Sequence, residues 1–212
     1  RYRSRAVVGL LLALAGVIGV WGIAFFSFEL VRLVLNQKFQ AEGLSGVQLA
    51  GKLTYWTGIT SMIQNIGAFF GVYSFGLLAQ RVGRKPAFAV SFVLAMTSVA
   101  STFWFLRDFG DLWLVPLMGF GTLSVFGGYA IYFPELFPTR LRSTGTSFCY
   151  NVGRFVAASG PALLGLLTGV VYKDTGATDP AMPLRYAGVT MCSVYLIGLI
   201  ALNFAPETRG QP

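Results

Sequence analysis

Six long apolar runs constrain the fold of this chain more than any other feature, and they cover about residues 6–28, 55–79, 87–106, 112–133, 144–171 and 186–205. Each reaches the roughly 20 residues that a helix needs to cross about 30 Å of hydrocarbon. In lipid, every backbone amide must find its partner within the segment, which favours helices. The alternation of a membrane β-barrel is missing from runs such as Val7–Val20. The sequence therefore predicts an all-α membrane protein with six transmembrane helices.

The composition supports lipid as the solvent and argues against several other functions. Only 11% of the residues are charged, against roughly 25% in soluble domains. The net charge of +8 comes from small basic clusters rather than a continuous stripe, so we expect no nucleic-acid partner. The chain has no histidine, and Cys149 and Cys192 both lie in apolar runs. Because no metal-ligand, nucleotide-binding or catalytic motif is present either, we expect no metal, no cofactor and no enzyme activity.

The basic residues predict the orientation of the chain in the membrane. If both ends are cytoplasmic, nine basic residues lie inside, namely Arg1, Arg3, Arg5, Arg81, Arg84, Lys85, Arg140, Arg142 and Arg209. Six lie outside, namely Arg32, Lys38, Lys52, Arg107, Lys173 and Arg185. Cytoplasmic loops carry an excess of lysine and arginine. We therefore expect a multi-pass protein of the plasma (inner) membrane with both ends in the cytoplasm.

Three phrases between or after these runs carry a resemblance to a known superfamily. The phrase from Tyr132 to Ser147 resembles the loop between the fourth and fifth helices in the C-terminal half of major facilitator superfamily transporters. The phrase from Gly76 to Lys85, Gly-Leu-Leu-Ala-Gln-Arg-Val-Gly-Arg-Lys, is similar to that superfamily's Gly-x-Leu-x-Asp-Arg-x-Gly-Arg-Lys loop. Pro-Glu-Thr-Arg-Gly at 206–210 resembles the tail of sugar porters and of organic-acid symporters of the aromatic or sialic acid type.

This resemblance implies an architecture and a function. It implies a C-terminal six-helix half of a twelve-helix fold: residues 1–5 would end the central cytoplasmic linker, 6–205 form the transmembrane domain and 206–212 begin the cytoplasmic tail. The partners would be the missing N-terminal six-helix half, the lipid bilayer and a small organic solute, either a sugar or an organic acid. The implied function is secondary active transport by alternating access, as proton-coupled symport. The alternative is a non-transporting membrane receptor or scaffold on the same fold.

In the resembled superfamily the first, second, fourth and fifth helices of each half border the central cavity. The candidate cavity residues are therefore Phe25, Phe26, Gln64, Asn65, Tyr129, Asn151 and Arg154. Arg154 stands out because an arginine inside a span costs about 2.5–3.5 kcal/mol even on insertion scales. It could attract an anionic substrate, pair with an acid of the missing half, brace the fold through Glu135, or snorkel to the interface. The Gln64–Asn65 amides could meet substrate hydroxyls or a neighbouring helix.

Glu29 at the end of the first run has two interpretations. An ion pair with Arg32, one helical turn later, is the structural one. The alternative is a proton-carrying carboxylate. No other acid lies within an apolar run.

By resemblance, the cytoplasmic motif residues form the charge network of an inner gate. They are Gly76, Arg81, Gly83, Arg84, Lys85, Glu135, Arg140, Arg142, Glu207 and Arg209. Gln80 stands where the superfamily loop has aspartate, so one charge interaction of that loop is missing here. These basic residues could also serve only to orient insertion.

Two further patterns concern packing. Gly67-x-x-x-Gly71 and Gly165-x-x-x-Gly169 fit the close approach of membrane helices. The segment from Ala41 to Leu53 predicts either a short surface helix or an outward extension of the second span.

Overall fold

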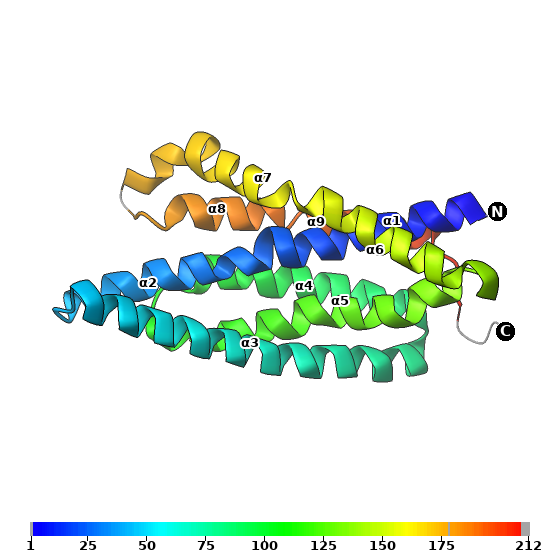
Figure 1. Cartoon of the computed structure of the whole chain (residues 1–212), viewed down its shortest axis with the longest axis horizontal. Coiled ribbons are helices and arrows are strands. Elements are labelled where there is room, and N and C mark those ends of the chain that lie inside the picture. The colour runs from blue at the N-terminus through cyan, green and yellow to red at the C-terminus, as the bar shows by residue number, and fades with distance from the viewer. Residues whose placement is uncertain (1, 178, 209–212) are drawn as a thin grey trace.

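The computed structural model describes residues 2–177 and 179–208, which form an elongated helical bundle with no strand in those ranges (Figure 1). Six helical segments are long and apolar enough to cross a membrane, namely Arg3–Ala41, Gly46–Val82, Arg84–Phe105, Phe109–Leu136, Thr139–Val171 and Met182–Phe204. The prediction of an all-α protein with six transmembrane helices is confirmed.

Several of the six segments consist of shorter helices that follow one another. The first comprises α1 (Tyr2–Val17), the π-helix η1 (Ile18–Ile23), the 3-10 turn η2 (Ala24–Phe26) and α2 (Ser27–Ala41). The second and third are α3 (Gly46–Val82) and α4 (Arg84–Phe105), and the fourth joins η3 (Phe109–Trp113) to α5 (Leu114–Leu136). The fifth runs through η4 (Thr139–Leu141), α6 (Arg142–Ala157), α7 (Gly160–Leu166) and η5 (Leu167–Val171). After η6 (Lys173–Ala177), α8 (Met182–Met191) and α9 (Val194–Phe204) form the sixth.

The first two spans extend beyond the apolar runs. The first continues to Ala41, and α3 begins at Gly46, so the segment after Ala41 mainly extends the second span and forms no separate surface helix. The turn between them uses Gly43 and Gly46, with φ of +83° and +56°. Glycine adopts this region of backbone space without the penalty that a Cβ brings.

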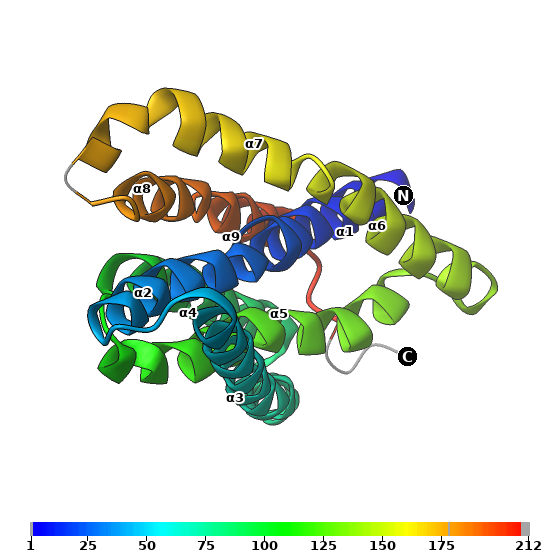
Figure 2. The ribbon, with the colours of Figure 1, turned by 60° about the vertical axis from the view of Figure 1, so that its left-hand side comes forward.

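The connections divide between the two ends of the bundle. Both termini, the α3–α4 turn and the α5–α6 turn lie at one end, and the other connections lie at the opposite end (Figures 1 and 2). At that opposite end Lys38 pairs with Asp108 (Nζ–Oδ1 3.3 Å), and Lys52 pairs with Glu42 at 3.0 Å. The backbone N–H of Phe109 and the Lys38 ammonium hold the pKa of Asp108 below its usual range. The connections thus fall into two sets at opposite ends of the bundle, as the sequence predicts. Which set faces the cytoplasm stays a prediction.

Helices α3 and α5 meet along glycines. A methyl group on Gly67 would overlap the carbonyl oxygen of Pro116, and one on Gly71 would overlap that of Phe120. The predicted packing role of Gly67 and Gly71 is therefore confirmed. Gly165 and Gly169 differ, because a Cβ on either would meet nothing within 4 Å in the described chain. The predicted packing role of Gly165 and Gly169 is therefore not seen among residues 2–177 and 179–208.

Candidate functional site

The site is built around the irregular middle of the first span. Gly16 and Gly19 lie directly against the hydroxyl groups of Tyr129 and Tyr195, so that no Cβ fits there. The helix widens to the π-form just after Gly16 and tightens to a 3-10 turn before α2. Gly22 faces Gly160, at the point where the fifth span is interrupted between α6 and α7. Short π-helical segments are frequent at functional sites.

Arg154 lies beside these two interruptions. It follows the start of α6 by twelve residues, which is about 18 Å along the helix. The residue is exposed, and it lines a groove of about 360 Å³ with Val17, Trp21, Ala157, Ala158 and Pro161. Within residues 2–177 and 179–208 it forms no ion pair. The alternative of a brace through Glu135 is wrong, because Glu135 pairs with Arg84.

A second groove lies between η2, α2 and α3. Phe25, which is 55% exposed, Phe26 and Glu29 line it together with residues of α3 that include Thr57 and Ser61. Glu29 and Arg32 both border this groove, yet no ion pair within 4.0 Å joins them in the described structure. The predicted Glu29–Arg32 pair is therefore not formed.

The two adjacent amides of α3 point in different directions. Asn65 is exposed beside Ser61 and Phe69, and its Nδ2 donates a hydrogen bond to the Ser61 carbonyl oxygen at 2.8 Å. The Gln64 backbone and side chain lie against Gly119 of α5. Ser61 borders the groove of Glu29 as well as the hollow of Asn65. Asn65 thus shares a continuous open surface with Phe25, whereas Gln64 packs on a neighbouring helix.

Tyr129 and Asn151 also differ in their surroundings. Tyr129 is fully buried, its hydroxyl donates a hydrogen bond to the Leu12 carbonyl oxygen, and its ring stacks on Phe133 at 4.6 Å. The structure places it inside the described helical bundle rather than on the open surface. Asn151 is exposed on α6, one turn before Arg154, and donates to the Ser147 carbonyl oxygen at 2.9 Å.

At the end of the bundle that holds both termini, the motif residues form a compact charged cluster. Arg84 makes a two-point ion pair with Glu135, with Nη2–Oε1 at 2.8 Å and Nε–Oε2 at 3.2 Å. The Thr208 hydroxyl donates a hydrogen bond to Oε2 of the same carboxylate. Two-point arginine–carboxylate pairs combine strength with a fixed geometry. The pair therefore holds the start of α4 against the end of α5.

Glu207 closes the N-terminus of α4. Its carboxylate accepts the backbone N–H groups of Arg84 and Lys85 at 2.9 and 3.0 Å. These donors have no partner within the helix, and the helix dipole favours a negative charge there. Gly83 precedes them with φ of +97°, and a Cβ on it would lie 3.0 Å from Glu207 Oε2. Backbone conformation and space thus both favour glycine at this position.

The sequence did not predict that two further side chains, Tyr132 and Arg5, take part in this cluster. The Tyr132 hydroxyl donates to the Pro206 carbonyl oxygen at 2.6 Å, and Arg5 Nη1 donates to the Leu136 carbonyl oxygen at 3.1 Å. Tyr132 begins one of the three motif phrases and Pro206 begins another. Their contact could have been inferred only by assuming that the phrases meet in space.

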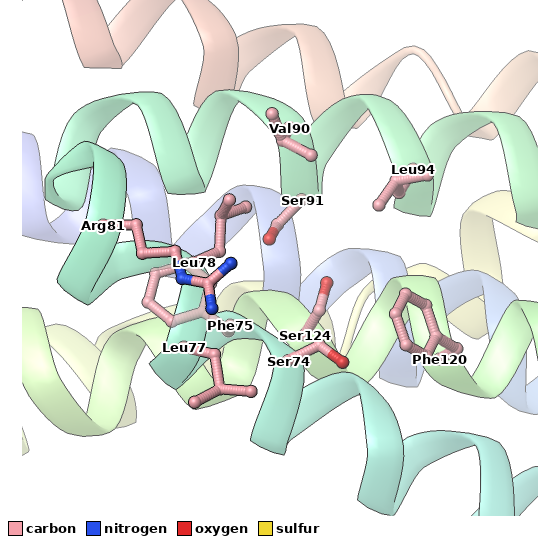
Figure 3. Close-up of a pocket in the computed structure, with 10 residues that line it drawn as sticks. All are labelled: Ser74, Phe75, Leu77, Leu78, Arg81, Val90, Ser91, Leu94, Phe120 and Ser124. Atoms are coloured by element: carbon pink, nitrogen blue, oxygen red, sulfur yellow. The ribbon is translucent and has the colours of Figure 1, made fainter.

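The remaining motif residues lie around this cluster. Arg81 points into a cleft between α3, α4 and α5 (Figure 3). Arg140 and Arg142 are exposed at the α5–α6 turn, and a Cβ on Gly76 would meet nothing within 4 Å. Arg209 lies outside the described residues.

Arg185 was counted above only among the basic residues outside the membrane, yet it is a buried charge. It is 3% exposed, and its Nη1 donates to the carbonyl oxygens of Phe103 and Trp104 at 3.1 and 3.3 Å. Asp179 lies 3.9 Å from its Nε. A cation at the C-terminal carbonyls of α4 is favourable for the helix dipole. Charged side chains therefore satisfy both ends of α4.

Acidic and sulfur ligands do not gather anywhere in the described residues as a group of three or more that could hold a metal ion.

Comparison with known proteins decides the family. Residues 8–121, more than half of the chain, match the family described as "Sugar (and other) transporter". The chain belongs to the sugar (and other) transporter family. The predicted membership of the major facilitator superfamily is thereby confirmed.

The curated relatives of this chain include several transport proteins. A putative metabolite transport protein of Haemophilus influenzae is 30% identical over 74% of this chain and 35% of its own length. A probable 4-methylmuconolactone transporter of Cupriavidus pinatubonensis is 30% identical over 72% of this chain and 33% of its own length. The cis,cis-muconate transport protein of Acinetobacter baylyi is 32% identical over 65% of this chain and 31% of its own length. The chain spans about a third of the length of these curated relatives.

Proposed function

We propose that this chain is the C-terminal six-helix half of a secondary active transporter that moves a small organic acid across the membrane by alternating access. The observation that carries the proposal is Arg154, an exposed arginine in a groove at membrane depth with no ion pair in the described residues. Intramembrane charges are tolerated where water, a partner or a ligand meets them. A carboxylate is the complementary ligand for a guanidinium.

The relatives support an acid over a sugar. Two of them carry the names of a muconate and a methylmuconolactone transporter, and muconate is a dicarboxylate. In the proposed site Arg154 binds a carboxylate, while Trp21, Phe25 and the exposed amide of Asn65 contact the rest of the molecule. Gln64 and Tyr129 support this surface from within the half-bundle.

The inner gate of the proposed transporter uses the charged cluster of Arg84, Glu135 and Glu207. Within this half the cluster fixes the C-terminal segment to the inner ends of α4 and α5. In the proposal, exposed basic residues of the same end, Arg140 and Arg142, meet the other half when the gate is closed. Such a multi-point contact has two discrete states, whose populations a substrate can shift.

The proposal includes coupling and orientation. Glu29 borders the groove of Phe25 and Arg32, and we assign it the role of proton carrier for symport. Both ends of the chain face the cytoplasm, and the protein lies in the plasma membrane, in accordance with the excess of basic residues at the end that holds the termini.

Uptake by the full-length protein in liposomes tests the proposal. Labelled cis,cis-muconate should enter in preference to labelled glucose, and Arg154→Gln should lower muconate uptake at least about tenfold, because a charge-assisted hydrogen bond is lost. Arg3→Gln, an equal loss of charge on an exposed residue, is the matched control and should leave uptake unchanged.

Two outcomes would contradict the proposal. Uptake that is unaffected by Arg154→Gln removes Arg154 from the substrate site. Saturable muconate binding without uptake would favour the alternative of a receptor on a transporter fold. For the coupling, an imposed inward proton gradient should accelerate uptake in the wild type and not in Glu29→Gln.

A further inference from the structure

A cleft of about 340 Å³ opens between α3, α4 and α5, near the end of the bundle that holds both termini (Figure 3). Its lining combines one arginine, three serines and six apolar side chains: Ser74, Phe75, Leu77, Leu78, Arg81, Val90, Ser91, Leu94, Phe120 and Ser124. Arg81 is the penultimate residue of α3, so its guanidinium lies in the part of the cleft nearest to this end of the bundle. From there the cleft extends about two helical turns inward to Ser74.

The polar groups of the cleft converge. Figure 3 shows the guanidinium of Arg81 and the hydroxyl of Ser91 pointing into the same space. Ser91 is 2% exposed, and its hydroxyl forms no hydrogen bond within the described part of the chain. Buried hydroxyls normally have a partner, either in the protein or in a bound molecule. The Ser91 side chain lines the cleft, and its oxygen is open to it, so the hydroxyl can donate a hydrogen bond to a molecule bound there.

This cleft is separate from the proposed substrate surface. Ser74 follows Asn65 by nine residues, which is about two and a half helical turns, so the two residues lie on opposite sides of α3. Arg81 follows Ser74 by seven residues and shares its side. If Asn65 faces the transport pathway, Ser74 and Arg81 face away from it. The rim on this side is apolar and open, with Leu77, Val90 and Leu94 between 39% and 45% exposed.

We propose that this cleft binds an anionic phospholipid. The lipid phosphate lies between the Arg81 guanidinium and the hydroxyls of Ser91 and Ser74, because arginine and hydroxyl donors suit phosphate oxygens. The upper part of an acyl chain lies deeper, against Leu94 and Phe120. A soluble anion would use only the polar groups and leave the apolar lining without a partner.

A lipid bound in this cleft would regulate the protein or anchor it in the membrane. It would not be the transported solute. Basic residues close to a membrane surface attract anionic lipids in general, but each of them only weakly. A built cleft adds fixed hydroxyl donors and an apolar wall, and so gives selectivity among lipids. The proposal is independent of what the full-length protein transports.

Native mass spectrometry of the full-length protein, delipidated in detergent, tests the site. With phosphatidylglycerol and phosphatidylcholine of identical acyl chains, we expect preferential retention of phosphatidylglycerol. Arg81→Gln should lower its retained fraction about tenfold, and Ser91→Ala, which removes one neutral hydrogen bond, about threefold. Arg81→Lys keeps the charge and should retain more lipid than Arg81→Gln.

Matched controls separate the cleft from general effects of charge and of the mutation. Arg3→Gln removes an exposed charge at the same end, and Ser98→Ala makes the same change on α4 outside the cleft; neither should alter retention. Equal retention of both lipids, or equal losses in Arg81→Gln and Arg3→Gln, would overturn the proposal. Displacement of the lipid by inorganic phosphate alone would show a soluble-anion site and overturn it as well. If Arg81→Gln does not fold, Ser91→Ala replaces it as the test. Unchanged retention of phosphatidylglycerol in Ser91→Ala would then overturn the proposal.

Discussion

Arg185 shows how a single side chain can stabilise one end of a span. Its guanidinium is buried in α8 and donates to two carbonyl groups at the end of α4. The carboxylate of Asp179 lies close by, at a longer distance of 3.9 Å. Nε itself forms no hydrogen bond in the described residues and has only this longer contact, whereas removal of the side chain would leave the two facing carbonyl groups without a partner.

We expect Arg185→Ala to lower the free energy of unfolding by about 2–4 kcal/mol, because two charge-assisted hydrogen bonds and the packing of the side chain are lost. The thermal unfolding midpoint of the full-length protein in detergent measures the change. Arg107→Ala removes an exposed arginine at the same end and should have little effect. Equal midpoints for the two variants would show that Arg185 has no such role.

The sequence indicated some of these residues and missed others. Arg84, Glu135 and Glu207 were predicted from the motif phrases, and the structure brings them together. The role of Arg185 was missed because an arginine near a loop gives no local sign that it will be buried. Tyr132 was named only as the first residue of a motif phrase, and its contact with Pro206 was missed because the two residues are 74 positions apart in the chain.

At the scale of elements, the glycine seam between α3 and α5 determines how closely the second and fourth spans approach. We expect Gly71→Ala to destabilise the full-length protein by about 1–3 kcal/mol, because its methyl group would overlap the Phe120 carbonyl oxygen. Gly76→Ala makes the same change on the same helix where nothing lies within 4 Å, and should be neutral or slightly stabilising. Comparing unfolding midpoints of the two variants measures the difference, and a Gly71→Ala protein as stable as Gly76→Ala would refute this assignment.

The number and type of the spans could be predicted because hydrophobic length is a local property of the sequence. The irregular middle of the first span could not. Its π-helix coincides with glycines pressed against Tyr129 and Tyr195, which lie more than one hundred residues away in the chain. The groove of Arg154 depends on the same interruption. The sequence therefore indicated the arginine but not the hollow that makes it accessible.

For the whole molecule, the two-ended arrangement of loops allows a direct test of orientation. Gln80→Cys and Gln40→Cys place the same exposed residue at opposite ends of the bundle, and the native Cys149 and Cys192 are buried. In intact cells that express the full-length protein, an impermeant thiol reagent added outside should label Gln40→Cys and not Gln80→Cys. The reverse pattern would invert the proposed topology.

The cap that Glu207 forms on α4 also has a consequence for biosynthesis. The carboxylate and the amides it binds are separated by more than 120 residues. When all six spans have been synthesised, the first turn of the third span still lacks its anion, because Glu207 follows the end of α9. This end of the bundle is thus completed only after all six spans have been synthesised, so products shortened before Glu207 should be recognisable by an unprotected start of α4.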